Sequence, residues 1–432
     1  MTKRQITFFL PLALAFVAFP SFAAVMIFVE DDQYEEKMLA LLQEADEARF
    51  ISLAQRLSAR GKSLPKIQAV LADRLTSKNV QLRASCVDAI PYLGPAEKQT
   101  IKKMIVSMAL GGLVKSSSEP YTKVVADALE KIGPTTLPVA IEYLNTKNFD
   151  QYIGVTDLIS RLGDHAEDAI EPLVKNLKPG KFQWSTTYAL MGIGEEATTA
   201  IEGLRKMLES DKFNTVCIAC RALAKMGSAG LAAKEQLKEI AQKGNVSERG
   251  RALEALGGIG AANDDPDVQK LMEEGFGAFH QSIRERVTVG VELMGKKGKS
   301  FIPIVEKAIR DPTYKSKHFA GIALYKIGGS KDLALETLMK ATKNPVFEVD
   351  AIRWIGEFKN DGQAAIPLLT QYLDGTDEDL KTTVIETLFK IGIDAKIKKK
   401  LESILVTDGY LSVRAARTTL ADLEKNPTPK CQ

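Results

Sequence analysis

A short pattern returns about every 33 residues along most of this chain, a period typical of stacked supersecondary repeats. A helical stretch ends with two apolar residues three positions apart, and a glycine follows, as in residues 129–133 (Leu-Glu-Lys-Ile-Gly). The eleven anchor positions are Gly94, Gly133, Gly163, Gly194, Gly227, Gly260, Gly295, Gly328, Lys359, Gly392 and Glu424. Two of these anchors replace glycine but keep the preceding apolar pair. Such regular spacing indicates a continuous array of repeats rather than independent globular domains.

Each unit is predicted to be two helices joined by a turn. In the unit before Gly227, the residues Ala219, Ala222, Leu223 and Met226 lie at i, i+3, i+4 and i+7 and form one apolar stripe. Glycine after the last turn supplies a left-handed helix cap. One hairpin cannot bury its stripe alone, whereas stacked neighbours bury a continuous core. We therefore expect an all-α fold, an α-solenoid of about eleven two-helix repeats.

The turn and cap residues resemble those of HEAT repeats. Asp311-Pro312 and Asn344-Pro345 lie between paired helices, second helices end in Leu-x-x-Ile-Gly, and a first helix begins with Ile-Pro-x-Leu at residues 366–369. The pattern is most similar to the short repeats of phycobilin lyase subunits and covers about residues 63–424. The resemblance implies a superhelical solenoid. It leaves the function open, because repeats of this kind serve many roles.

Three segments depart from the repeat. Residues 33–62 have apolar residues at helical spacing, which predicts one or two amphipathic helices that cap the first repeat. The interval between Gly94 and Gly133 is the longest between consecutive anchors, so it is expected to contain a loop insertion. Residues 425–432 predict a short disordered tail.

The N-terminus has the features of an export signal. Two basic residues precede an uncharged, mostly apolar run (residues 6–19), and Ser21 and Ala23 are small residues at the −3 and −1 positions of a signal-peptidase site. Residues 1–23 therefore predict a signal peptide. Residues 6–29 carry no charge and are also long enough to remain as a membrane anchor. In either case we expect an exported protein of the bacterial periplasm or cell envelope.

Composition and motifs give no support for catalysis. The 58 Lys and Arg residues nearly balance 55 Asp and Glu, so the marked basic excess of a nucleic-acid-binding protein is missing. His165, His280 and His318 are scattered and lack the His-Glu pairs of HEAT-type di-iron hydroxylases. We therefore assign no catalytic residue, no metal ligand and no cofactor. The glycine-rich segments at 192–197 and 290–296 are interpreted as repeat ends, and the acidic segment 264–267 as a solvated turn.

Cys217 and Cys220 form a CxxC pair, but they lie within a predicted helix. Two cysteines at i and i+3 of a regular helix meet disulfide geometry poorly. Cys220 also occupies the small core position that alanine fills in other repeats. We expect core packing, and a redox role for the pair stays open.

Charged and aromatic residues recur on the predicted second helices, which line the concave face in solenoids of this type. Acids lie six residues before the first three anchors, and basic residues and aromatics follow in later repeats. Charged helix faces are commonly just solvated, but this stripe would also suit a protein partner. The candidate partner-binding residues are Asp88, Asp127, Asp157, Trp184, Tyr188, Arg221, Arg251, Arg286, Lys317, Phe319, Arg353 and Trp354.

Together these features favour an exported, non-enzymatic scaffold that binds a protein or peptide along its concave surface. Two alternatives stay open. The resemblance to short lyase repeats allows a lyase-like or chromophore-handling protein. An uncleaved residue 6–29 segment would instead make the chain a membrane-tethered envelope assembly factor.

Overall fold

The computed structural model describes residues 31–57, 63–115 and 119–407, together with 412, 415, 416, 419 and 420. The predicted signal peptide, the predicted tail and the anchor Glu424 lie outside the described residues. The chain divides into two compact units, Met1–Ala96 and Glu97–Gln432.

The smaller unit consists of two helical hairpins over its described residues. Its helices are α1 (Asp31–Glu44), α2 (Glu47–Leu57), α3 (Pro65–Asp73) and α4 (Val80–Ala89). α1 packs against α3, and α2 against α4, so the first hairpin stacks on the second as one repeat stacks on another. Where the sequence predicts one or two amphipathic helices over residues 33–62, the structure has α1 and α2, and Leu42, Phe50, Leu53 and Leu57 of their apolar stripe are buried.

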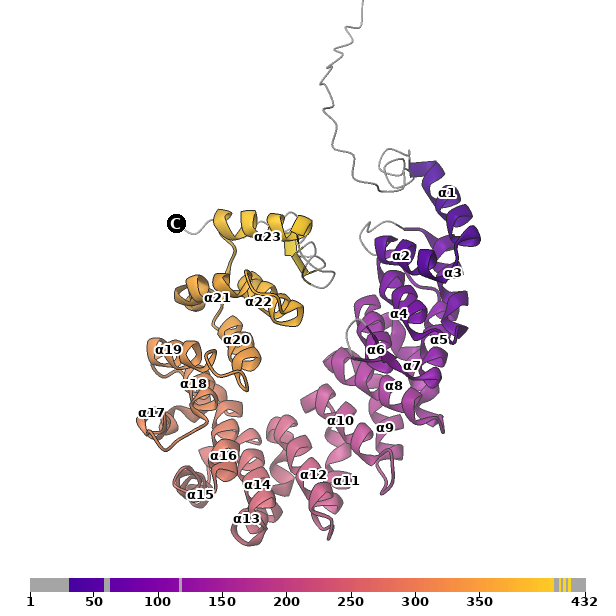
Figure 1. The fold of residues 1–432 in the computed structure, drawn as a ribbon. Helices are drawn as coiled ribbons and strands as arrows, with labels where there is room; N and C mark the ends of the chain where they lie inside the picture. The colour runs from indigo at the N-terminus through magenta and orange to yellow at the C-terminus, as the bar shows by residue number, and fades with distance from the viewer. Residues whose placement is uncertain are drawn as a thin grey trace, which may run out of the picture. The chain divides into compact units, whose positions relative to one another are not determined.

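In the larger unit the helices again come in pairs, which follow one another in sequence order (Figure 1). The first helices are α5 (Lys98–Ser107), α7 (Leu137–Glu142), α9 (Ile170–Asn176), α11 (Ile201–Leu208), α13 (Lys234–Lys243), α15 (Pro266–Phe276), α17 (Ile302–Arg310), α19 (Lys331–Ala341) and α21 (Ile366–Tyr372). The second helices are α6 (Tyr121–Ile132), α8 (Phe149–Leu162), α10 (Gln183–Ile193), α12 (Phe213–Lys225), α14 (Val246–Gly258), α16 (Gln281–Leu293), α18 (Lys317–Lys326), α20 (Glu348–Glu357) and α22 (Glu378–Ile391). α23 (Ala395–Thr407) begins a further repeat.

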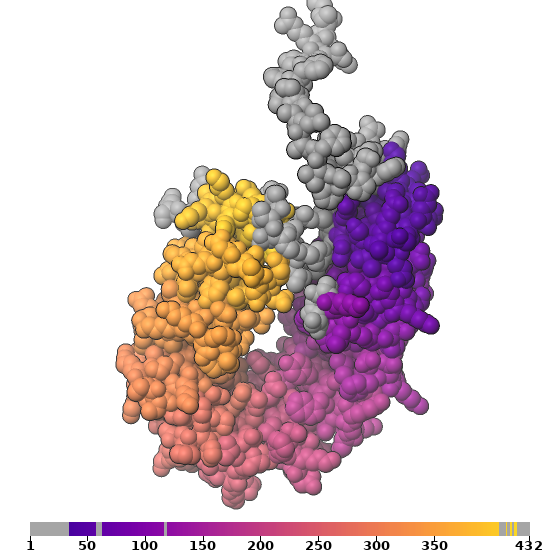
Figure 2. All heavy atoms as spheres, in the orientation of Figure 1, coloured from indigo at the N-terminus to yellow at the C-terminus, as the bar shows by residue number. Residues whose placement is uncertain are grey.

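Consecutive second helices lie side by side, and we call their line from α6 to α22 the second-helix row. Most neighbours in this row pack directly on each other, for example α8 on α10 and α14 on α16. The space-filling view shows neighbouring repeats of the larger unit packed without a gap (Figure 2). The fold is the predicted all-α repeat solenoid.

Positive φ angles mark the junctions between repeats, but the predicted left-handed helix cap is found only in part. Gly260 lies in the left-handed helical region (φ 74°, ψ 15°), whereas Gly133, Gly163 and Gly194 combine positive φ with ψ angles of −163°, −129° and −133°. The anchor glycines have positive φ angles, from 52° at Gly295 to 123° at Gly392. Lys359, which replaces glycine at its anchor, has a φ of 49° and is the one non-glycine residue with positive φ in the described part of the chain. The fold therefore holds a lysine at positive φ, although a residue with a side chain disfavours this conformation.

Short polar side chains start several of the second helices. The Asn148 side chain accepts a hydrogen bond from the Gln151 amide at 2.9 Å. Asn245 and Glu248 form a reciprocal capping box at the start of α14. These bonds satisfy amide groups that have no partner within the helix.

The insertion between Gly94 and Gly133 contains a short β-ladder where the sequence predicted only a loop. β1 (Leu113–Val114) pairs antiparallel with β2 (Glu119–Pro120). Gly111 and Gly112, with φ angles of 53° and 105°, turn the chain into this ladder. Two-residue strands are too short for an alternating pattern to reveal them.

Glycines let three second helices approach closely in the middle of the row. A Cβ atom on Gly257 of α14 would overlap the carbonyl oxygen of Gly290 in α16 and lie 2.7 Å from its Cα. A Cβ atom on Gly258 would lie 2.8 Å from the Ala224 Cα in α12. No side chain fits at either contact. We call Gly257, Gly258 and Gly290 the glycine contact.

Within the described residues, none of the helices combines the length and the apolar character needed to span a bilayer.

Candidate functional site

The acidic residues near the start of the second-helix row share one arginine. Arg161 of α8 donates from Nη1 to Asp127 at 2.7 Å and to Glu130 at 3.0 Å, both on α6, and from Nη2 to Asp157 at 3.0 Å. Burial raises the pKa of Asp127, and the positive charge of Arg161 opposes this shift. Burial disfavours the charge of Arg161, but the bond to Asp157 raises its pKa above the usual value. Arg161 therefore pairs with two predicted partner-binding acids, but its single charge leaves these three carboxylates with an excess of two negative charges.

Asp88 belongs to the smaller unit, where it lies half-buried on α4. The structure therefore does not join it to the other candidates, all of which lie in the larger unit.

Trp184 and Tyr188 lie one turn apart on α10, and both are nearly half exposed. The Arg221 guanidinium of α12 lies 5.8 Å from the centroid of the Tyr188 ring, a cation–π contact. The predicted Tyr188 and Arg221 are thus neighbours, one repeat apart. Trp184 is nearer the start of α10 and lines a pocket formed by two interhelical turns.

Arg251 and Arg286 share one buried carboxylate. Glu254 of α14, 6% exposed, accepts from Arg251 Nη1 at 2.6 Å and lies 3.5 Å from Arg286 Nη1 of α16. Burial lowers the pKa of Arg286, as does the like charge of Arg251, while Glu254 opposes both effects. This pair of predicted basic residues is largely a structural cluster, with an excess of one positive charge.

The cysteines behave as packing residues. Cys86, Cys217 and Cys220 are free thiols, and Cys220 is fully buried. Burial raises the pKa of Cys217 and, to a greater extent, that of Cys220. Because the thiolate is the reactive form, both groups are poor nucleophiles at neutral pH.

An aromatic cluster joins α18 to α20. His318, 3% exposed, stacks on Phe347 with ring centroids 3.8 Å apart and lies 5.7 Å from Trp354. Phe319 lies 5.4 Å from Trp354. Burial lowers the pKa of His318 to about 4, and the carboxylates of Glu285 and Asp350 oppose this effect. The predicted Phe319 and Trp354 therefore belong to one cluster; Lys317 begins α18 beside it and is half-buried.

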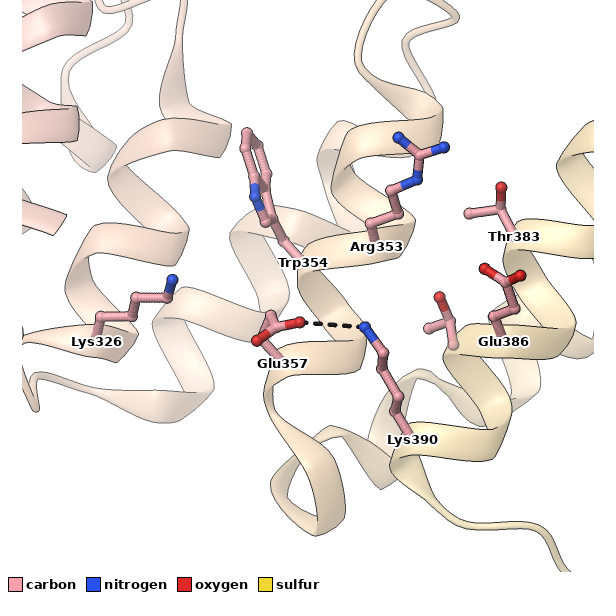
Figure 3. Close-up of a pocket in the computed structure, with 8 residues that line it drawn as sticks. Lys326, Arg353, Trp354, Glu357, Thr383, Glu386 and Lys390 are labelled. Carbon is pink, nitrogen blue, oxygen red and sulfur yellow. Dashed lines mark hydrogen bonds and ion pairs between the residues drawn. The ribbon is translucent and has the colours of Figure 1, made fainter. Parts of the chain in front are cut away.

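A groove of about 430 Å³ opens on α18, α20 and α22. Arg353 and Trp354 project from the same side of α20 in Figure 3, and Lys326 reaches toward them from α18. The Arg353 side chain is 63% exposed, and its ion pair with Asp350 has a long N–O distance of 3.9 Å. The lining residues that the sequence did not single out are Lys326, Glu357, Thr383, Glu386, Thr387 and Lys390.

Most charged residues in this groove are held by ion pairs between repeats. Lys390 of α22 lies 3.3 Å from Glu357 of α20, and Lys326 lies 3.0 Å from Glu292 of α16. Glu386 also lines the groove; burial raises its pKa, and the charge of Arg353 opposes this shift. The groove therefore presents Arg353 and Trp354 among charges that are mostly paired.

The acidic turn at residues 264–267 starts a helix. Asp265 caps α15 by accepting from the amides of Asp267 and Val268. Its carboxylate also lies 3.0 Å from Lys234 and 3.2 Å from Lys238, and the bond to Lys234 is the main reason that its pKa is lowered. The described residues contain no group of three or more His, Cys, Asp or Glu side chains placed to hold a metal ion.

No protein-family model matches this chain. No curated protein sequence matches it either. Solved structures with similar folds include the Kap95:Nup1 complex, with a TM-score of 0.46 at 11% identity over 94% of this chain and 66% of that one. Kap121p gives a TM-score of 0.40 at 14% identity over 94% of this chain and 51% of that one.

A designed armadillo repeat protein gives a TM-score of 0.31 at 15% identity and covers 44% of this chain and all of that one. The chain spans between half and two thirds of the length of the two Kap proteins. These likenesses concern the fold alone, and the assignment of the solenoid rests on the helices of this chain.

Proposed function

We propose that this chain is an exported, non-enzymatic scaffold that binds a protein or peptide partner along the second-helix row. The observation that carries the proposal is the groove on α18, α20 and α22, which combines an exposed arginine with a tryptophan. Arginine and tryptophan are the residue types most enriched at the energetic centres of protein interfaces.

Trp354 is held in place before any partner arrives. Its ring lies against Phe319 and near the buried His318, so its binding would cost little side-chain entropy. Arg353 is largely exposed and is held only weakly by Asp350, which leaves it available to a carboxylate of the partner. A bidentate arginine–carboxylate pair beside an apolar contact on Trp354 would supply both orientation and affinity.

The non-enzymatic part of the proposal is supported by the state of the ionisable groups. Lys326 and Lys390 are paired with glutamates, and the raised pKa values of Cys217 and Cys220 keep those thiols protonated. Such groups suit a binding surface better than proton transfer or nucleophilic attack.

Export to the periplasm or cell envelope is part of the proposal and rests on the sequence of residues 1–29. An intact-mass measurement of the protein from its native host tests it. A mature chain that starts at Ala24 supports cleavage of a signal peptide. A chain that retains residues 1–23 and is recovered in the membrane fraction would instead support a membrane-tethered protein.

Charge reversal with a matched control tests the binding face. Arg353→Glu places a negative charge in the groove, whereas Arg310→Glu makes the same change on α17, a first helix, at a side chain with the same 63% exposure. Tagged wild-type and variant proteins would be purified from the cell envelope with their partners and quantified by mass spectrometry. We expect Arg353→Glu and Trp354→Ala to lose a stoichiometric partner that Arg310→Glu retains. Equal partner recovery by all variants would contradict the proposal.

A further inference from the structure

A second, larger pocket lies away from the Arg353 groove, between the turns of two neighbouring repeats. It has a volume of about 840 Å³ and is lined by the turn after α9, the start of α10, the end of α11 and the start of α12. We call it the turn pocket. Its size falls within the range of pockets that hold ligands or several side chains of a peptide.

The walls of the turn pocket are apolar and aromatic. Leu177 and Met207 line it together with Trp184 and Phe213. Trp184 is 46% exposed and Phe213 is 50% exposed, although they lie on neighbouring repeats that could have packed them together. Two aromatic side chains that remain exposed on either side of a recess are typical of a binding site.

Apolar surface continues from this pocket toward the preceding repeat. Phe182, at the start of α10, stacks on Tyr152 with centroids 4.1 Å apart and lies 6.2 Å from Phe149. Phe149 is itself 46% exposed. An extended segment that enters the pocket would therefore find a further apolar contact on the adjacent turn.

Lysines line the pocket or lie next to its lining residues in the sequence. Lys206 and Lys212 line it, and Lys178 and Lys181 flank its lining residues Pro179 and Gly180 in the sequence. Among the described residues, no acidic side chain forms an ion pair with Lys178, Lys206 or Lys212, and Asp211 is the one acid in the lining. The surplus positive charge complements an acidic ligand.

We infer that the turn pocket binds an extended acidic peptide segment of a partner protein. A large apolar side chain of that segment would enter between Trp184 and Phe213, and a neighbouring carboxylate would pair with Lys206 or Lys212. A recess with walls from two repeats suits a peptide better than a flat lipid surface. This site is separate from the groove of the proposed function, and neither depends on the other.

The two tryptophans of the chain allow the two sites to be read separately. Trp354→Phe leaves Trp184 as the fluorescent reporter of the turn pocket, and Trp184→Phe leaves Trp354 as the reporter of the groove. The probes are synthetic peptides of equal length made from Glu and Phe, Glu and Ser, or Lys and Phe, and vesicles of phosphatidylglycerol. We expect the Glu/Phe peptide to shift the Trp184 emission at lower concentration than the other probes.

Two further variants test the contacts. Lys206→Glu with Lys212→Glu is expected to weaken Glu/Phe binding by roughly tenfold or more. Gly203→Leu fills the pocket from α11: its Cβ would meet the flexible Leu177 Cδ2 at 2.8 Å, and removing a helical glycine favours folding. This variant is expected to stay folded and no longer bind the Glu/Phe peptide.

Three results would overturn the inference: no Trp184 response to the Glu/Phe peptide, an equal response to the Lys/Phe peptide, or a response to vesicles alone. A response of Trp354 without Trp184 would also reject the turn pocket, while supporting the proposed function of the groove.

Discussion

Glu357 and Lys390 are 33 residues apart in the sequence, and their charged groups lie 3.3 Å apart in space. Glu292 with Lys326 and Glu130 with Arg161 repeat this relationship at separations of 34 and 31 residues. The length of the repeat is therefore also the length that brings opposite charges together on neighbouring second helices. Because those charges satisfy one another, the most weakly paired residues of the row are the ones available to a partner. Arg353, whose ion pair with Asp350 has a long N–O distance of 3.9 Å, is the clearest case.

Burial predicts that the ion pairs of the row differ in their contribution to stability. Glu254 is 8% exposed at its side chain and is shared by two arginines, whereas the Glu357 side chain is 46% exposed. We expect Glu254→Gln to lower the free energy of local unfolding around α14 by about 2 kcal/mol. Glu357→Gln should change it by about 0.5 kcal/mol or less around α20. Hydrogen–deuterium exchange of the two helices measures both, and equal effects would contradict the role given to burial.

The left-handed conformation of Lys359 predicts that glycine is the better residue there. Lys359→Gly removes the steric cost of a side chain at positive φ and should stabilise α20 and α21 by about 1 kcal/mol. The reverse change, Gly295→Lys, has open space around its Cβ position, so it should cost a similar amount through the backbone alone. Urea unfolding midpoints of the two variants and the wild type provide the comparison. A loss of stability in Lys359→Gly would show that the lysine side chain outweighs its strain.

The buried His318 predicts acid sensitivity. Burial lowers its folded-state pKa from 6.5 to about 4, so below pH 6.5 the unfolded chain binds a proton that the folded chain does not. The contribution of His318 to the free energy of unfolding is fully present above pH 6.5. It is lost as the pH falls toward 4, and the loss reaches at most about 3 kcal/mol. His318→Phe keeps an aromatic ring on Phe347 but cannot be protonated.

The difference in melting temperature between His318→Phe and the wild type, measured from pH 7 to pH 4, isolates this histidine, because the carboxylates titrate in both proteins. We expect the melting temperature of His318→Phe to rise relative to that of the wild type as the pH falls. Parallel curves would exclude His318 as the source of acid sensitivity.

The glycine contact predicts opposite results for the same substitution at equivalent repeat positions. Gly257 and Gly356 both lie three residues before their anchors. Gly257→Ala forces α14 away from the backbone of α16 and should cost about 3 kcal/mol. At Gly356 a Cβ would approach the flexible Lys390 Cδ at 3.2 Å and make ordinary contacts with Thr387 from 3.5 Å, so Gly356→Ala should be neutral or stabilising by up to about 1 kcal/mol. Thermal melts of both variants test the contrast.

The repeat pattern was sufficient to predict the fold, because each junction needs a positive φ, which glycine adopts most readily. Even the substituted anchor Lys359 was assigned to its place by the spacing and has the expected positive φ. The β1–β2 ladder was missed, since two-residue strands leave no periodic signal.

The candidate site was predictable only in part. Two residues of the stripe, Arg353 and Trp354, line a surface groove, and their role in partner binding stays a prediction. Charge alone did not distinguish exposed residues from paired ones. Aligning the repeats at their anchors would have revealed part of the pairing. Arg161, Lys326 and Lys390 each lie two residues before an anchor, and Glu130, Glu292 and Glu357 lie two or three residues before the preceding one. The turn pocket had no such signal. The stripe selected only Trp184 of its lining, because the other residues are of several types and lie in irregular turns and at helix ends.

The glycine contact also has a mechanical consequence. Where the backbones of α14 and α16 touch, neighbouring repeats cannot slide or rotate without atomic overlap, so this joint is stiff. Between α18 and α20, the His318 ring stacks on the rings of Phe347 and Trp354, and stacked rings can shift in their planes with little loss of contact. Bending of the larger unit around a partner is therefore expected to concentrate at the aromatic joint, directly beside the Arg353 groove.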